Sequence, residues 1–112
     1  MRTLTTTIAV AVLSLSGTAF AEDAGKVWKA KCASCHGDAG DPKGKPQGEK
    51  MKVASMAAAD WQKKFSDEDL TKATVEGVKR EKDGVKQQMK GYKELTPDVV
   101  KALVAQMRSF KK

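Results

Sequence analysis

Cys32-Ala33-Ser34-Cys35-His36 is the stretch on which the rest of this 112-residue chain depends. Two cysteines separated by two residues, with a histidine directly after the second, form the attachment pattern of a c-type haem. The two thiols add to the haem vinyl groups as thioethers, and the tethered backbone then delivers His36 to the iron, for which imidazole is a suitable ligand. The pattern therefore predicts one haem c, covalently attached through Cys32 and Cys35, with His36 as the proximal ligand.

Three other uses of a cysteine pair fit this chain less well. A disulfide between Cys32 and Cys35 closes so short a loop that it constrains the unfolded chain little. A thioredoxin-like redox pair needs a βαβ setting, and no strand-like alternation surrounds these residues. A zinc site needs a fourth ligand, whereas the whole chain holds two cysteines and one histidine. Haem attachment alone explains why the single histidine follows the cysteine pair.

The first 21 residues are typical of a secretory signal peptide. Arg2 supplies the positive charge, residues 8–15 form a short apolar run, and Ala19-Phe20-Ala21 is a small-x-small cleavage site. The apolar run is shorter than the roughly 20 residues that a bilayer span needs. We therefore expect cleavage after Ala21, which leaves one exported domain of residues 22–112 without a membrane span.

The expected mature domain is small and basic. Its aromatic residues are few, so a buried haem would supply the missing apolar centre, and the haem-free chain should fold poorly. The chain carries 21 Lys and Arg against 14 Asp and Glu, and because the leader contains only Arg2, the mature domain keeps a side-chain charge of +6. An exported haem domain rarely meets nucleic acid. Lysines near a haem favour docking to acidic redox proteins, beside their general role in solubility. The lysines closest in sequence to the expected haem-contacting segments are Lys29, Lys31, Lys43, Lys45, Lys86 and Lys90.

Helical periodicity and capping residues predict an all-α domain. The expected helices cover residues 24–31, residues 57–65 with Asp60 as cap, a stretch from Ser66 as cap to about Gly77, and a stretch from Thr96 as cap, with Pro97 in first position, to Phe110. Residues 37–59 and 79–91 lack such periodicity and are expected to be irregular, the second with a turn at Asp83-Gly84. A loop as long as the first is justified if it wraps one side of the haem.

A low-spin electron carrier needs a second strong iron ligand. With one histidine in the chain, a methionine thioether is the usual choice. Met1 leaves with the leader, and Met107 belongs to the apolar stripe of the last helix. Met89 is favoured because it lies in an irregular segment between two helices, where a side chain can point to a buried centre. Met51 and Met56 in the long loop remain alternatives, as does an open or lysine-bound position.

These features together resemble the small class I bacterial cytochromes c, over essentially the whole mature chain. The matching pieces are the N-terminal helix running into Cys32-Ala-Ser-Cys35-His36-Gly37, a methionine after a middle helix, and Leu95-Thr-Pro-Asp98 opening a C-terminal helix. The resemblance implies the cytochrome c fold, with about four short helices around one haem and the terminal helices crossing. It also implies His36 and Met89 as axial ligands and electron transfer in the periplasm as the activity.

Two positions depart from the family's pattern. Lys90 follows Met89 where proline is common, so that loop is expected to be less rigid. Gln106 or Met107 stands where an aromatic residue is common, so the helix crossing is expected to pack differently around Trp28.

The sequence thus predicts a monomeric, periplasmic one-electron carrier that meets redox partner proteins. The alternative is a gas-binding or sensing haem protein with an open or labile sixth position. An enzyme such as a peroxidase is not favoured, because no distal histidine or acid–base pair is evident. The family often uses a loop proline carbonyl to accept the N–H of the proximal imidazole, and Pro46 is the candidate here.

Overall fold

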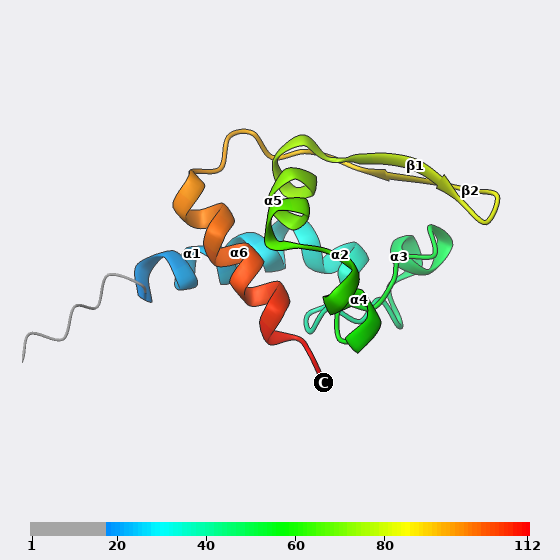
Figure 1. Ribbon diagram of the computed structural model, residues 1–112, viewed down its shortest axis with the longest axis horizontal. Coiled ribbons are helices and arrows are strands. Elements are labelled where there is room, and N and C mark those ends of the chain that lie inside the picture. Colours follow the sequence, from blue (N-terminus) through cyan, green and yellow to red (C-terminus); the bar gives the residue numbers. More distant parts are fainter. Residues whose placement is uncertain (1–17) are drawn as a thin grey trace, which may run out of the picture.

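The chain forms a helical domain from which one β-hairpin projects (Figure 1). The computed structural model describes residues 18–112, so most of the expected signal peptide lies outside the described residues. In chain order the elements are α1 (Thr18–Val27), the π-helix η1 (Trp28–Cys32), α2 (Ala33–His36), α3 (Pro46–Lys50), α4 (Ala59–Lys64), α5 (Asp67–Glu76), β1 (Val78–Lys82), β2 (Val85–Met89) and α6 (Pro97–Ser109). The expected all-α fold is confirmed, with the hairpin as an addition to it. Within residues 18–112, no helix has the length and apolar character needed to cross a bilayer.

The N-terminal helix runs directly into the cysteine motif, through η1 and α2. In η1 the amide of Ala33 donates to the carbonyl of Trp28, five residues earlier, which is the wide turn of a π-helix. Such turns occur often at functional sites. Trp28 and Cys32 both lie on the buried side of this turn, with exposed fractions of 1% and 7%. Trp28 and Cys32, four residues apart, therefore share one side of the helical run.

Helix α6 crosses α1, and this crossing contains the core of the domain (Figure 1). Its start is as predicted, with Thr96 as N-cap and Pro97 in the first position. The buried stripe of α6 consists of Val100, Leu103, Val104 and Met107. The rings of Trp28 and Phe110 lie 5.0 Å apart between centroids. Phe110, one turn after Gln106, thus supplies the aromatic contact to Trp28.

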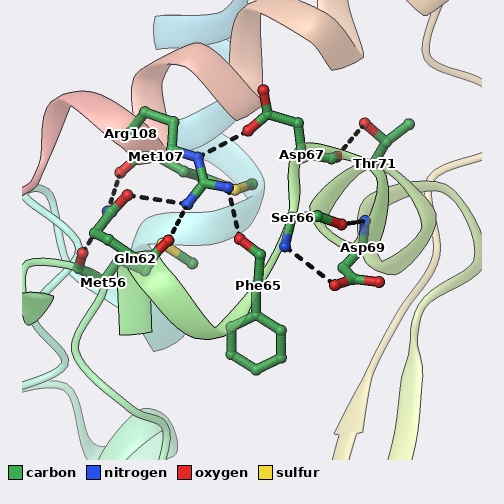
Figure 2. Close-up of polar contacts among 9 residues, drawn as sticks. All are labelled: Met56, Gln62, Phe65, Ser66, Asp67, Asp69, Thr71, Met107 and Arg108. Carbon is green, nitrogen blue, oxygen red and sulfur yellow. Dashed lines mark hydrogen bonds and ion pairs between the residues drawn. The ribbon is translucent and has the colours of Figure 1, made fainter. Parts of the chain in front are cut away.

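Arg108 joins the end of α6 to the segment between α4 and α5 (Figure 2). Its Nη1 donates to the backbone and side-chain oxygens of Gln62, at 2.9 and 3.1 Å, and its Nη2 donates to the carbonyl of Phe65 at 2.6 Å. Its Nε donates to Asp67 Oδ1 at 2.8 Å. Because the Asp67 side chain is 75% exposed, this ion pair contributes little, and the bonds to Gln62 and Phe65 matter more.

Gln62 extends this network to two residues of the core (Figure 2). Its Nε2 donates to the carbonyls of Met56 and Met107, at 2.6 and 2.9 Å. Both methionines are buried. The polar network of Arg108 and Gln62 therefore holds α4, α6 and the segment before α4 in one arrangement.

The variant Arg108→Ala should lower the free energy of unfolding by about 2 kcal/mol, because the partly buried oxygens of Gln62 and Phe65 lose their donor. Lys101→Ala is the matched control, since Lys101 is an exposed cation on the same helix. Its effect should stay within about 0.5 kcal/mol. Chemical denaturation of the two haem-loaded variants measures the difference. Equal midpoints for both variants would contradict this role of Arg108.

Helix α5 begins with a complete capping box. Ser66 Oγ accepts from the amide of Asp69 at 3.1 Å, and the amide of Ser66 donates to Asp69 Oδ2 at 3.0 Å. These bonds, chiefly the one from the Ser66 backbone, lower the pKa of Asp69. The predicted cap at Ser66 is thus confirmed, and the short aspartate side chain closes the box as glutamate usually does.

The predicted cap of α4 is wrong. Asp60 lies inside the first turn of this helix, and the N-cap is Ala58, which makes no side-chain capping bond. Trp61 and Phe65 pack against each other at the end of this helix, with ring centroids 5.5 Å apart.

The segment over residues 79–91 is not irregular, as the sequence predicted, but largely a β-hairpin. Strands β1 and β2 pair antiparallel, with Val78 opposite Met89 and Lys82 opposite Val85. The predicted turn is its tip, where positive φ values of 50° and 75° at Asp83 and Gly84 are those of a type I′ turn. Such a turn matches the twist of paired strands, and so an Asp-Gly pair favours a hairpin over a loop.

The long segment over residues 37–59 also contains more structure than predicted. Pro46 occupies the first position of the short helix α3, which is a position that proline favours. The rest of the segment is formed by turns. A hydrogen bond from the amide of Met56 to the carbonyl of Gly40 brings the two ends of the segment together.

Candidate haem site

A cavity of about 890 Å³ opens beside the cysteine motif. Ligand pockets typically measure roughly 300–1,000 Å³, so this one has room for a large ligand. Its Trp, Phe and Tyr side chains come from three parts of the chain and are Trp28, Trp61, Phe65 and Tyr92. Its sulfur-bearing residues are Cys32, Cys35, Met51, Met56, Met89 and Met107. The fold therefore gathers nearly all the chemistry-bearing residues of the sequence analysis around one apolar space.

The two cysteines reach this cavity from the continuous helical run. Both carry free thiols, Cys32 buried and Cys35 half-buried. Burial raises the pKa of Cys32 to about 11, so its thiol stays protonated at neutral pH. Two thiols on one wall of the cavity, without a bond between them, match the requirement of two thioether links.

His36 faces the same space and stays neutral. Burial lowers its pKa, and the neutral imidazole is the form that binds a metal. Its Nδ1 is buried and has no hydrogen-bond partner among the described residues. The expected bond to the Pro46 carbonyl is therefore not formed. Pro46 is the first residue of α3, so its carbonyl points along that helix and not toward the ring.

Trp28 packs against the imidazole and holds the end of the motif. Its ring centroid lies 5.9 Å from that of His36. Its indole Nε1 donates to the carbonyl of Gly37 at 2.9 Å, in a buried position. A buried indole N–H needs such a partner, and here the partner is the residue that ends α2. Trp28 thus fixes the backbone directly after His36.

Helix α3 supports the motif from another side. A Cβ atom on Gly48 would collide with the carbonyl oxygen of Cys35, and it would lie 3.0 Å from the Cβ of Pro42. Only glycine lets α3 come this close to α2. The position of α3 is therefore tied to the position of the cysteines.

The four methionines of residues 22–112 differ in how deeply they are buried. Met56 and Met107 are each 5% exposed and belong to the core cluster. Met51, at the end of α3, and Met89, at the end of β2, are half-buried. Met89, the ligand favoured from the sequence, lines the same cavity as His36, and so do Met51, Met56 and Met107.

These residues fit a haem. The porphyrin leaves the iron two axial positions, and nitrogen or thioether donors are suited to them. Two free thiols, a neutral imidazole with an unpartnered ring nitrogen and an apolar space lie together. A helical domain with this site is a c-type haem protein.

The comparisons with known proteins agree with this class. The sequence matches the Cytochrome c family over residues 21–111, and the chain belongs to that family. It is similar to the solved structure of the KustC0563 c-type cytochrome, with 38% identity and a TM-score of 0.65 over 80% of this chain and 98% of that one. No curated protein matches the sequence. The cofactor is therefore haem c, for which Cys32 and Cys35 provide the family's spacing, and members of the family are generally electron carriers that meet redox partner proteins.

The sequence analysis did not identify Gln87, which is buried beside the cavity. One signal was available. The Asp83-Gly84 turn favours a hairpin, and residues two apart in its second strand share one face, which places Gln87 on the side of Val85 and Met89.

Proposed function

We propose that this protein is a periplasmic electron carrier of the class I type, with one haem whose axial ligands are His36 and Met89. The observation that carries the proposal is the position of Met89, which lines the same cavity as His36 and both cysteines. When bound, the haem iron supplies a one-electron ferric–ferrous couple, and a thioether ligand raises its potential. Export agrees with the signal peptide that the sequence predicts in residues 1–21.

The residues of the chain have separate tasks in this function. Cys32 and Cys35 tether the cofactor, so it stays with the chain when the fold opens. Trp28 shields His36 on its buried side, and its bond to the Gly37 carbonyl fixes the backbone next to the ligand. Leu70 and Met56 are buried in the cavity wall and exclude water from it. A site whose two ligands stay in place needs little rearrangement when an electron arrives.

Acidic proteins are the partners that the charge distribution supports. Residues 78–93 contain six Lys and Arg residues but only two acidic residues, Glu81 and Asp83. Of the lysines singled out from sequence, Lys31 and Lys90 line the cavity, and Lys64 and Lys82 line it as well. Positive charge at this opening would steer an acidic partner protein toward the haem edge. The carrier would act as a monomer and form only brief complexes with that partner.

Replacing Lys82 and Lys90 together by Gln should slow electron transfer to an acidic redox protein by roughly tenfold at low ionic strength. The difference should disappear in high salt, where these charges are screened. The control removes two lysines that do not line the cavity, Lys101 and Lys112, and so causes the same change in net charge. Stopped-flow rates over a salt series measure both variants. Equal rates for the two pairs, or rates that ignore salt, would contradict docking at the cavity opening.

One observation favours the second candidate, a gas-binding protein with a labile sixth position. Met89 stands on a two-stranded hairpin, and an isolated hairpin is only marginally stable in water. Rapid binding of carbon monoxide to the reduced protein at neutral pH would support this candidate. Slow binding would support the electron carrier.

A further inference from the structure

We infer that Gln87 is a positioning residue whose buried amide fastens the hairpin to the end of α3 and thereby keeps Met89 on the cavity side. This inference rests on the proposed ligation by Met89. Retention of that ligand then depends on the side-chain amide of Gln87.

Gln87 is the one buried residue of the two strands. It is 7% exposed, whereas the other residues of β1 and β2 are half-buried or exposed. A buried amide is tolerated when its donors and acceptor are satisfied. The Nε2 of Gln87 donates to the carbonyls of Met51 and Lys52, at 2.8 and 3.2 Å, and its Oε1 accepts from Arg80 Nε at 2.7 Å. The amide is thus fully engaged between the hairpin and the loop.

The acceptors of Gln87 belong to the end of a helix. Met51 is the C-cap of α3, and Lys52 follows it with a positive φ of 52°. Carbonyls at a helix end lack partners within the helix and need other donors. Since Gly48 of α3 packs on the Cys35 carbonyl, this helix end is placed relative to the haem motif. Gln87 therefore connects the hairpin to the part of the chain that holds the cofactor (Figure 1 shows the hairpin running beside α3).

Because side chains alternate between the two faces of a strand, the attachment of Gln87 also determines which way Met89 points. Residues two apart in a strand point to the same face, so Gln87 and Met89 share the inner face of β2, while Gln88 points the other way. The turn at Asp83-Gly84 sets the pairing of β1 with β2 but not the position of the hairpin on the body. A rotation of the strand that freed Gln87 would also turn Met89 away from the cavity.

Met89 lies between two supports. The base of the hairpin is held where the amide of Tyr92 donates to the Thr74 carbonyl at 2.9 Å. Gln87 holds the strand on the other side of Met89. Without Gln87 the methionine would be restrained from the base alone, and its displacement from the iron would become easier.

The test compares haem-loaded Gln87→Leu with Lys86→Leu, which replaces an exposed polar side chain of the same strand that does not line the cavity. Two readouts follow the ligand: the weak red absorption band of the ferric iron–thioether bond, and the rate of carbon monoxide binding to the ferrous protein. Gln87→Leu should weaken the band and speed carbon monoxide binding by about tenfold, since two carbonyls lose their donor. Lys86→Leu should behave as the unmodified protein. Equal behaviour of the two variants would overturn the inference.

Two further variants separate this role from other effects. Arg108→Ala lowers stability without touching Met89, so it should leave the band unchanged; a band lost there as well would reduce Gln87 to a general structural role and overturn the inference. Met89→Ala tests the ligation itself. If Met89→Ala keeps the band, the proposed ligation fails; if it removes the band and Gln87→Leu keeps it, only the role of Gln87 fails.

Should Gln87→Leu not fold, Arg80→Leu replaces it. Arg80 is exposed, and its removal frees the Oε1 of Gln87 from its partner. A faster carbon monoxide reaction, by a smaller factor than for Gln87→Leu, is expected. A rate equal to that of the unmodified protein would then overturn the inference.

Discussion

The double variant Cys32→Ser/Cys35→Ser should carry no covalent haem and should lose most of its helical structure. Without thioethers the cofactor is held only by its axial ligands and by packing. Without the haem, the apolar walls of a cavity of about 890 Å³ would face water, and the small core between α1 and α6 would have to stabilise the chain alone. Whole domains are stable by only about 5–15 kcal/mol, so the loss of the apolar contacts with the cofactor is large on that scale.

Two measurements check this expectation. A haem stain after denaturing electrophoresis detects covalent attachment, and far-ultraviolet circular dichroism follows the helices. Ser34→Ala is the control, since Ser34 is exposed between the two cysteines and should change neither signal. A stained band for the double variant would show that haem is attached elsewhere. Full helicity without haem would show that the core of α1 and α6 suffices for folding.

The variant Met89→Ala should lose the iron–thioether absorption band and bind carbon monoxide rapidly. Its reduction potential should fall by on the order of 0.1 V, a modest part of the ~0.8 V that axial ligation spans. The fold should tolerate the change, because Met89 is half-buried at the end of a strand and not part of the core cluster. Spectra, carbon monoxide kinetics and a redox titration of the haem-loaded variant measure these effects.

Met51→Ala is the matched control for Met89→Ala. Met51 is also half-buried, lines the same cavity and lies outside the core cluster. It should retain the band and a nearly unchanged potential. A band that survives Met89→Ala but not Met51→Ala would move the ligand to α3. A protein without the band before any substitution would support the gas-binding candidate.

Features that depend on a few neighbouring residues were predicted correctly from the sequence. The starts of α5 and α6 are set by Ser66 and Thr96, whose side chains each accept from the amide three residues later. Pro97 supports the start of α6 because its ring fixes the helical φ of the first position. The stripe of α6 follows from helical periodicity. Asp60 shows the limit of such arguments, because Ala58 caps α4 although an aspartate lies only two residues later.

The hairpin was missed because its strands lack an apolar face. Val78–Lys82 and Val85–Met89 are rich in lysine and glutamine, so the usual alternation of apolar and polar residues is weak. The inner face covers a cofactor cavity and not a protein core, and it therefore needs few apolar side chains of its own. The Asp-Gly turn was the remaining local signal.

By itself the sequence determined the attachment of haem, the helical class and the two terminal helices, since each rests on chemistry between near neighbours in the chain. The tertiary structure alone decided the partners of distant residues. Gln87 and the Met51 carbonyl are 36 residues apart, and Arg108 and Gln62 are 46 apart. No local pattern specifies such pairs, because they form only when hydrophobic burial has brought the helices together. The same holds for His36, whose Nδ1 is left without the expected carbonyl because Pro46 begins a helix.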